Sequence, residues 1–235
     1  MKVKKTGILS LDTQLGGGIP SGSVVLVLEE PGAGGDILSY HFAVEGALNG
    51  ENVLYLATDD TEEEVKGYIN LYFNLDEAVW ENIILVSLSS PFTKEEEKDA
   101  KEFLKRTIYD PIGGLKTILN HEDFDRIVIN NMTYFIANYP IEDVVSLTDV
   151  FSKYAKENQS VFMTLMTKGM FDPRTETAIK HHSDGVIELT LREVENEVQR
   201  RLKVTKFKGI LVPKAILRYD LTEKGIKMES VMRVL

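Results

Sequence analysis

Residues 29–36 have the form of a phosphate-binding loop whose binding residues have been replaced. A loop of this kind reads G-x-x-x-x-G-K-[ST]: backbone N–H groups surround the phosphates, the Lys contacts the β and γ oxygens, and the hydroxyl binds Mg²⁺. In this chain Glu29 stands in place of the first Gly, Gly35 in place of the Lys, and Asp36 in place of the Ser or Thr. The turn itself remains, as Pro31, Gly32, Ala33 and Gly34. The sequence therefore predicts the shape of the loop without the cation and the hydroxyl that its chemistry requires.

The charges around this loop are negative where a nucleotide would need them positive. Helix N-termini favour anions, and we therefore expect Asp36 to cap its own helix and to occupy the position of a phosphate. Glu29 and Glu30 add further negative charge. Each like charge close to a triphosphate costs on the order of 1 kcal/mol near a protein surface, and more where water is excluded.

Alternating strands and helices must hold this loop in place. Continuous apolar runs, typical of strands buried on both faces of a parallel sheet, occupy residues 24–28, 53–57, 83–86, 126–130 and 161–165. Apolar residues at helical spacing fill 37–48 and 141–157, and a further helix is expected to begin at 61–64. This alternation predicts an α/β fold with a parallel sheet.

Two regions depart from the alternation. Residues 93–120 are charged and then helical, and Ile112-Gly113-Gly114 is expected to interrupt them as a mobile loop. After Gly185 the pattern changes to short strands joined by turns, at 186–191, 198–206, 215–220 and 225–228. We therefore expect an antiparallel extension of the sheet over 184–235, preceded by an α/β core over 24–183 and a leader over 1–23.

Composition narrows the class of protein. The chain has a formal net charge of −10, no cysteine, 43% hydrophobic and 27% charged residues, which is typical of a globular protein. No run approaches the roughly 18 apolar residues of a membrane span, and no apolar signal region follows the basic residues 1–6. These features predict a cytoplasmic protein without disulfides or thiolate metal sites.

The acidic balance also weakens the case for a dedicated DNA-binding protein, because neutralisation of phosphates drives that affinity. Basic residues nevertheless gather near the C-terminus, at Arg200, Arg201, Lys203, Lys206, Lys208, Lys214 and Arg218. Solvated strand faces explain them most simply. A subunit contact or an anion site remains the alternative.

Three short stretches near the start of the chain carry a family resemblance. Residues 6–8 read Thr-Gly-Ile, Leu11-Asp12 follows, and residues 15–23 read Leu-Gly-Gly-Gly-Ile-Pro-Ser-Gly-Ser. This pattern resembles the leader of the RecA/RadA/KaiC-like ATPases, in which it delivers the chain to the first core strand. Residues 184–189 and 206–209 are also similar to the C-terminal strands of KaiC-like domains.

The resemblance covers nearly the whole chain and implies a RecA-like three-layer domain over 1–235, with a mostly parallel central sheet flanked by helices. Single-domain KaiC-like proteins fit it best. The family also implies a Walker B acid, where this chain has Asn130, and a catalytic acid after the second strand, where it has Asp59 and Asp60. In KaiC-like rings a basic segment faces the nucleotide of the adjoining subunit, which implies contacts in trans for Lys206 and Lys208.

Three replacements at once, of the Lys, the Mg²⁺-binding hydroxyl and the Walker B carboxylate, remove both the phosphate clamp and the metal site. We therefore interpret the chain as a pseudo-ATPase that acts as a regulatory or assembly protein, forming a homo-oligomer or a hetero-oligomer with a RecA/KaiC-like paralogue. No bound ATP, Mg²⁺ or other metal is expected. One alternative is a weak or atypical ATPase that uses a neighbour's Lys. The other is an accessory protein in DNA recombination or repair.

Other polar and aromatic residues follow the predicted strands. Thr164, Thr167 and Lys168 lie at a strand end, where α/β sheets present ligands, and would serve a nucleotide bound in an unusual way. Tyr134, Phe135 and Tyr139 follow Asn130 closely. We expect these aromatic side chains to pack against a neighbouring subunit, with stacking on nucleic-acid bases as the alternative.

Overall fold

A nine-stranded sheet forms the middle of the molecule. The computed structural model describes residues 2–89 and 110–229, so the part of the prediction that concerns 93–109 lies outside the described residues. The strands lie in the order β11-β10-β9-β8-β3-β7-β6-β4-β5. Their bounds are β3 (Ser23–Glu29), β4 (Val53–Ala57), β5 (Ile83–Ser87), β6 (Arg126–Asn130), β7 (Val161–Thr167), β8 (Gly185–Val194), β9 (Glu197–Phe207), β10 (Leu217–Thr222) and β11 (Gly225–Met228).

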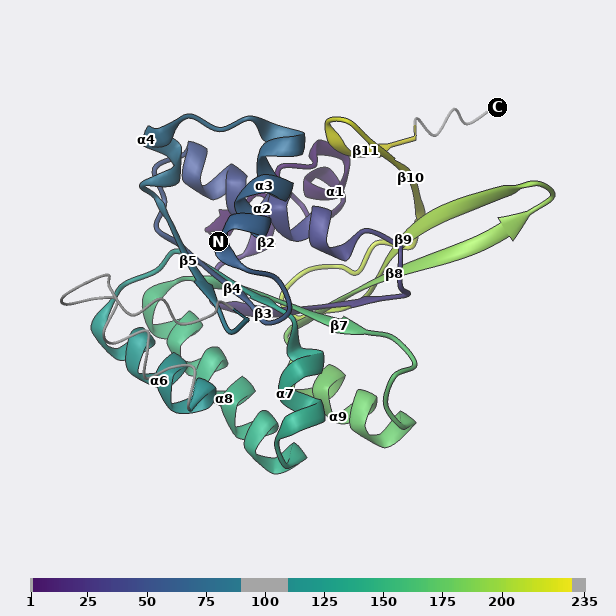
Figure 1. Cartoon of the computed structure of the whole chain (residues 1–235). Coiled ribbons are helices and arrows are strands. Elements are labelled where there is room, and N and C mark those ends of the chain that lie inside the picture. Colours follow the sequence, from purple (N-terminus) through teal and green to yellow (C-terminus); the bar gives the residue numbers. More distant parts are fainter. Residues whose placement is uncertain (1, 90–109, 230–235) are drawn as a thin grey trace.

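Helices cover both faces of this sheet, which makes three layers (Figure 1). One face carries α1 (Leu9–Gln14), α2 (Gly35–Leu48), α3 (Glu62–Phe73) and α4 (Glu77–Trp80). The other carries α6 (Pro111–His121), α7 (Met132–Asn138), α8 (Ile141–Asn158) and α9 (Pro173–His182). The leader adds a two-stranded ribbon of β1 (Val3–Lys4) and β2 (Ile19–Pro20). The predicted three-layer α/β fold is confirmed.

The apolar run of β3 shows why the sheet sits between two cores. Val25 and Val27 contribute to the core beneath α2, whereas Val24, Leu26 and Leu28 contribute to the core beneath α8. All five side chains are fully buried. Successive strand residues point to opposite faces, so a strand covered on both sides must be apolar throughout.

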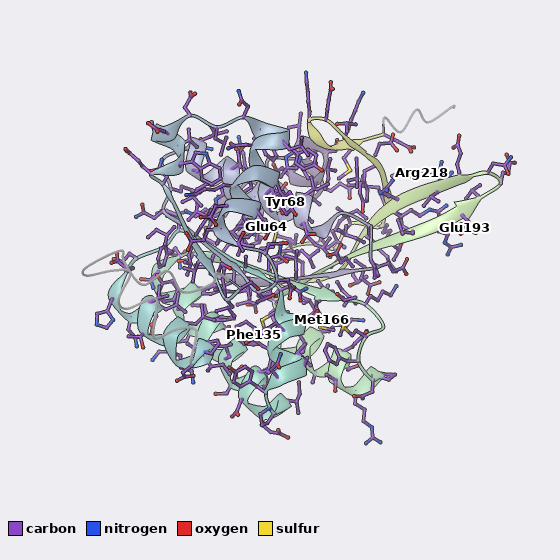
Figure 2. The ribbon with its side chains drawn as sticks, in the orientation of Figure 1. Glu64, Tyr68, Phe135, Met166, Glu193 and Arg218 are labelled. Atoms are coloured by element: carbon purple, nitrogen blue, oxygen red, sulfur yellow. The ribbon has the colours of Figure 1, made fainter. Side chains whose placement is uncertain are left out.

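The strands from β8 to β5 run parallel to one another, and those from β8 to β11 pair antiparallel. The antiparallel extension predicted after Gly185 is therefore confirmed. β8 and β9 continue past the body of the sheet as a long hairpin, with Glu193 near its tip (Figures 1 and 2). In the described residues no helix is long and apolar enough to cross a membrane.

One local prediction was wrong. Gly113 and Gly114 do not form a mobile loop but lie in the first turn of α6. Asp110 caps that helix by accepting a hydrogen bond from Gly113 N–H at 3.0 Å, and Pro111 occupies a position where it needs no donor. A capped first turn with Pro at its start is a strong helix signal, and it outweighs the low helix propensity of two glycines.

The amino ends of the parallel strands hold a balanced ion-pair network. Arg126, only 2% exposed, pairs with Glu51 and also donates to the carbonyls of Lys5 and Phe42. Its guanidinium lies 4.6 Å from the centre of the Phe42 ring. Lys4 joins the network through Glu51 and Asp125, each at 2.8 Å. Arg126, Lys4, Glu51 and Asp125 each have an ion-pair partner within this network.

Candidate functional site

The altered loop lies at the carboxyl end of β3, and the Glu29 side chain turns into it. Gly35 N–H donates to Glu29 Oε2 at 2.7 Å. A Cβ placed on Gly35 would lie 2.5 Å from the Glu29 carboxyl group, so the glycine and the inward-turned carboxylate fit each other. The N-terminal N–H groups of a helix attract anions, and here the chain supplies its own.

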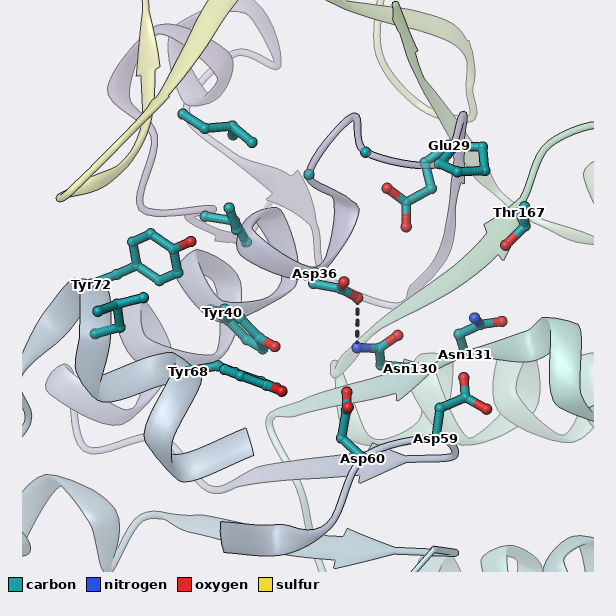
Figure 3. Close-up of a pocket in the computed structure, with 16 residues that line it drawn as sticks. Glu29, Asp36, Tyr40, Asp59, Asp60, Tyr68, Tyr72, Asn130, Asn131 and Thr167 are labelled. Atoms are coloured by element: carbon teal, nitrogen blue, oxygen red, sulfur yellow. Dashed lines mark hydrogen bonds between the residues drawn. The ribbon is translucent and has the colours of Figure 1, made fainter. Parts of the chain in front are cut away.

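Asp36 does not cap its helix, which corrects the expectation from the sequence. The N-cap of α2 is Gly34, and no side chain caps it. Asp36 Oδ1 instead accepts from Asn130 Nδ2 at 2.9 Å (Figure 3). Because Asp36 lies inside the first turn, its side chain points across to β6 rather than back to the N–H groups that precede it. The side chain that accepts from the first N–H of α2 is Glu29, which ends β3 and lies outside the helix.

Asn130 connects the loop to the buried interior. Its Nδ2 also donates to the Tyr55 hydroxyl at 3.0 Å, and that hydroxyl lies 2.9 Å from Ser39 Oγ. Ser39 Oγ in turn donates to the backbone carbonyl of Asp36 at 2.7 Å. This closed ring of hydrogen bonds orients the Asn130 amide, with its nitrogen toward the carboxylate. A nucleotide site of this kind has a hydroxyl on the helix and an acid on the strand. In this chain the helix carries the carboxylate of Asp36, and the strand carries the amide of Asn130.

These residues line a cavity of about 620 Å³ at the carboxyl ends of the parallel strands. Asp59 and Asp60, which follow β4, also line it, so the structure brings the loop and the predicted acids together (Figure 3). Thr167, at the end of β7, lines the opposite side. Ligands of α/β folds bind at this edge of the sheet. Lys168 lies close by but pairs with Glu30 at 3.3 Å, and Thr164 is buried inside β7.

Three of the cavity acids, Glu29, Asp36 and Asp60, have pKa values raised by desolvation and by neighbouring negative charges. Burial raises the pKa of Glu29 to about 7, and the neighbouring Asp36 adds to the shift. Burial likewise raises the pKa of Asp36, with a contribution from Asp59. Asp60 shifts in the same direction through burial and through Asp36, Glu64 and Asp59. Within the described ranges none of the four cavity acids, Glu29, Asp36, Asp59 and Asp60, forms an ion pair.

The second wall of the cavity is aromatic, and sequence reasoning missed it. Tyr40 comes from α2, and Tyr68, Leu71 and Tyr72 come from α3. Figure 3 shows the Tyr40 and Tyr68 hydroxyls directed across the cavity toward the acids. The spacing of Tyr68 and Tyr72, four residues apart on one helix, places them on one face and was the available signal.

The C-terminal extension closes over the loop from above. Tyr219, on β10, donates its hydroxyl to Ala33 O at 2.7 Å. Gly34 has φ = +94°, and a Cβ there would lie 2.8 Å from Leu221 Cδ2, so the close packing of β10 on the loop requires glycine. Arg200 Nε lies 3.4 Å from the Gly32 carbonyl oxygen. It is a positive charge beside the loop from this chain's own β9.

The two lysines expected to act in trans make contacts within their own chain. Lys206 Nζ donates to the carbonyls at the end of α9, those of Lys180, His181 and Ser183. Lys208 pairs with Asp184 at 2.8 Å. Because the Lys206 ammonium donates to all three carbonyls, it satisfies the acceptors at the end of α9 as a C-terminal cap does. Contact with a neighbouring subunit remains a prediction.

The aromatic residues after β6 also belong largely to their own domain. Phe135 is fully buried beneath the sheet, in contact with the rings of Tyr134 and Tyr139 (Figure 2). Both tyrosines are partly buried. The expectation that Phe135 packs against a neighbouring subunit or stacks on a base was wrong, because the ring completes the core between α7 and α8.

Comparison with known proteins matches nearly the whole chain. A model of the KaiC ATPase family matches residues 4–231. A UPF0273 protein of Pyrococcus furiosus is 29% identical over 234 residues, covering 94% of this chain and 92% of the relative. A UPF0273 protein of Thermotoga maritima is 27% identical, covering 96% of this chain and 95% of the relative. The circadian clock protein KaiC2 of a Synechocystis strain is 24% identical, covering 95% of this chain but only 38% of that protein.

Proposed function

The chain belongs to the KaiC ATPase family, and from that premise we propose that it is a pseudo-ATPase: a KaiC-like domain that neither binds Mg-ATP productively nor hydrolyses it. Its role is then regulatory or structural, exercised through assembly with itself or with a catalytically intact relative.

The observation that carries this proposal is the Glu29 carboxylate on Gly35 N–H. A β-phosphate would need the same N–H group, and to reach it the phosphate would have to displace the partly buried Glu29 side chain. The loop then offers no Lys to balance the phosphate charge, and Asp36 places a second carboxylate where the family has a hydroxyl. Like charges at such distances repel strongly where water is excluded.

Calorimetric titration with Mg-ATP and Mg-ADP tests the proposal, together with an ATPase assay against a KaiC-like protein that has an intact loop. We expect no heat of binding at nucleotide concentrations up to about 1 mM, which corresponds to less than about 4 kcal/mol of binding free energy. Micromolar binding or comparable turnover would overturn the proposal.

A restoring variant provides the positive control. Glu29→Gly, Gly35→Lys, Asp36→Thr and Asn130→Asp together rebuild the motif in this backbone. Glu29→Gly has to accompany Gly35→Lys because the carboxyl group lies where a Cβ would stand. We expect the fourfold variant to bind Mg-ATP, whereas Gly35→Lys alone does not. If the fourfold variant folds but binds nothing, the four positions do not account for the loss.

Assembly is supported by apolar side chains that the domain leaves uncovered. Leu9 on α1 is 82% exposed and Leu211, in the segment between β9 and β10, is 95% exposed. Exposed apolar groups in clusters are typical of contact surfaces. Sedimentation or light scattering, alone and with an intact relative, measures the expected complexes.

Weak nucleotide binding is the second candidate function, and Arg200 favours it. This side chain approaches the loop from β9 and could supply in cis the positive charge that the missing Lys supplied. Under this alternative Arg200→Ala abolishes a measurable nucleotide affinity. Under the pseudo-ATPase proposal there is no affinity to lose.

A further inference from the structure

We propose that the cavity at the altered loop binds a linear aliphatic di- or triamine, with its ammonium groups on the carboxylates and its carbon chain on the tyrosine wall. This inference rests on the proposed function, because it assigns a new class of ligand to a site that nucleotide has left.

Two largely buried residues present to the cavity a polar atom that makes no hydrogen bond to another described residue. Tyr40 is only 3% exposed, and its hydroxyl makes no hydrogen bond within the described residues, although Figure 3 shows it directed into the cavity. Asn130 is 7% exposed. Its Nδ2 is used twice, but its Oδ1 has no partner in the part of the chain that the structure describes. Both oxygens open onto the cavity, where a bound ligand could reach them.

A partner for these oxygens would donate hydrogen bonds and carry positive charge. The atoms that this partner would contact can all accept hydrogen bonds. They are Asn130 Oδ1, the Tyr40 hydroxyl oxygen, and the oxygens of Asp36 and Asp60. An ammonium group brings three donors and one positive charge, and therefore satisfies both deficits. The raised pKa values of Glu29, Asp36 and Asp60 follow from burial and mutual repulsion and agree with a site that lacks its countercharge.

The acids are too dispersed for a single metal ion. Within the described residues no three His, Asp or Glu side chains converge on a point where they would share one ion. Glu29 enters the cavity from β3, Asp36 from α2, and Asp59 and Asp60 from the turn after β4. Separated carboxylates around a cavity of about 620 Å³ suit separated positive charges on one flexible chain.

The apolar half of the cavity suits the carbon chain of such a molecule. Ile37, Leu71 and Leu221 line it together with the tyrosine rings. Methylene groups packed there leave water, at a gain of roughly 0.8 kcal/mol for each one fully buried. Ammonium groups are also attracted to the faces of aromatic rings.

Spermidine, a linear triamine, is the probe. Calorimetry and thermal denaturation at about 0.15 M salt compare it with MgCl₂ at matched ionic strength. We expect saturable one-to-one binding of spermidine and no specific effect of Mg²⁺. Saturable Mg²⁺ binding that excludes spermidine would overturn the proposal in favour of a metal site.

Three variants locate the binding. Asp36→Asn is expected to weaken spermidine binding ~10-fold or more, since it removes one charged hydrogen bond. Tyr40→Phe is expected to weaken it ~5-fold while leaving the unliganded protein at least as stable, because the lost hydroxyl has no partner. Glu157→Gln, on the exposed face of α8, is the matched control and is expected to change nothing. Equal affinity in all three variants would mean that the amine only screens the surface of an acidic chain, which overturns the proposal.

The two proposals fail separately. If Mg-ATP binds and spermidine competes with it, the pseudo-ATPase proposal fails. If neither binds, the pseudo-ATPase proposal stands and the amine site is refuted.

Discussion

The two ends of the parallel sheet differ in whether their charged side chains form ion pairs. At the amino ends of the strands, Arg126 and Lys4 are matched by Glu51 and Asp125. At the carboxyl ends, the four cavity acids have no cation within 4 Å in the described residues. A fold that requires only stability pairs its charges, and deviations gather where a protein acts. The contrast agrees with the proposal that the carboxyl end is the functional end of the sheet.

The largest effect is expected from breaking the balanced end. Arg126→Met should lower the free energy of unfolding by about 3–5 kcal/mol, because Glu51 then keeps only Lys4 and the carbonyls of Lys5 and Phe42 lose their donor. Urea unfolding at pH 7 measures the loss. The double variant Arg126→Met/Glu51→Gln should recover part of it, and a single variant as stable as the wild type would contradict the matched network.

Removing a charge at the carboxyl ends of the strands should raise the free energy of unfolding, whereas removing Arg126 lowers it. The folded-state pKa of Glu29 is raised from 4.5 to about 7. Its contribution to stability is therefore fully present below pH 4.5 and is lost as the pH rises through 7, a change on the order of 3 kcal/mol. Glu29→Gln should be more stable than the wild type at pH 8 and equal to it near pH 4. Unfolding curves at both pH values test this, and a wild type that gains stability between them would contradict it.

Adding a carboxylate at the carboxyl ends of the strands should lower stability, and by more at high pH than at low pH. Asn130→Asp places a second carboxylate next to Asp36 and removes the amide donor that it uses. We expect a loss of about 2 kcal/mol at pH 8 and a much smaller loss at pH 5, where one proton can be shared between the two acids. Equal losses at both pH values would indicate altered packing in place of charge repulsion.

The smallest effect concerns the helix that carries the tyrosine wall. Thr61 Oγ1 accepts a hydrogen bond from Glu64 N–H, and the Glu64 carboxylate accepts one from Thr61 N–H. Together the two bonds form a capping box at the start of α3. Thr61→Ala should cost about 1 kcal/mol. Thr177→Ala, inside α9, removes a Thr without removing a cap and should be neutral by the same urea measurement.

The fold could be predicted from the sequence to a large extent because burial on both faces forces a recognisable pattern. The strands from β3 to β7 are apolar throughout, and their order along the chain indicated a parallel sheet. The segment at Gly113 was misread because the Asp110 cap and Pro111 outweighed the glycines.

The site was predicted only in part. Asp59, Asp60, Asn130 and the loop meet as expected, since the carboxyl ends of parallel strands converge. Glu29, and not Asp36, accepts the hydrogen bond from Gly35 N–H. This depends on side-chain directions, which the spacing of residues along the sequence does not give. The position of Tyr40 opposite the acids likewise depends on how α2 packs against α3.

The contact between Tyr219 and Ala33 also bears on how the chain is made. Its two residues are 186 positions apart, and the bond from Ile226 N–H to His41 Nε2 spans 185. β3 pairs only with β7 and β8, which are synthesised more than 100 residues later. During synthesis on the ribosome, the apolar strand β3 therefore has no neighbouring strand to pair with until most of the protein has emerged. Contacts of such long sequence separation form slowly. We therefore expect the loop to reach its final shape late, once β10 and β11 pack against it and against α2.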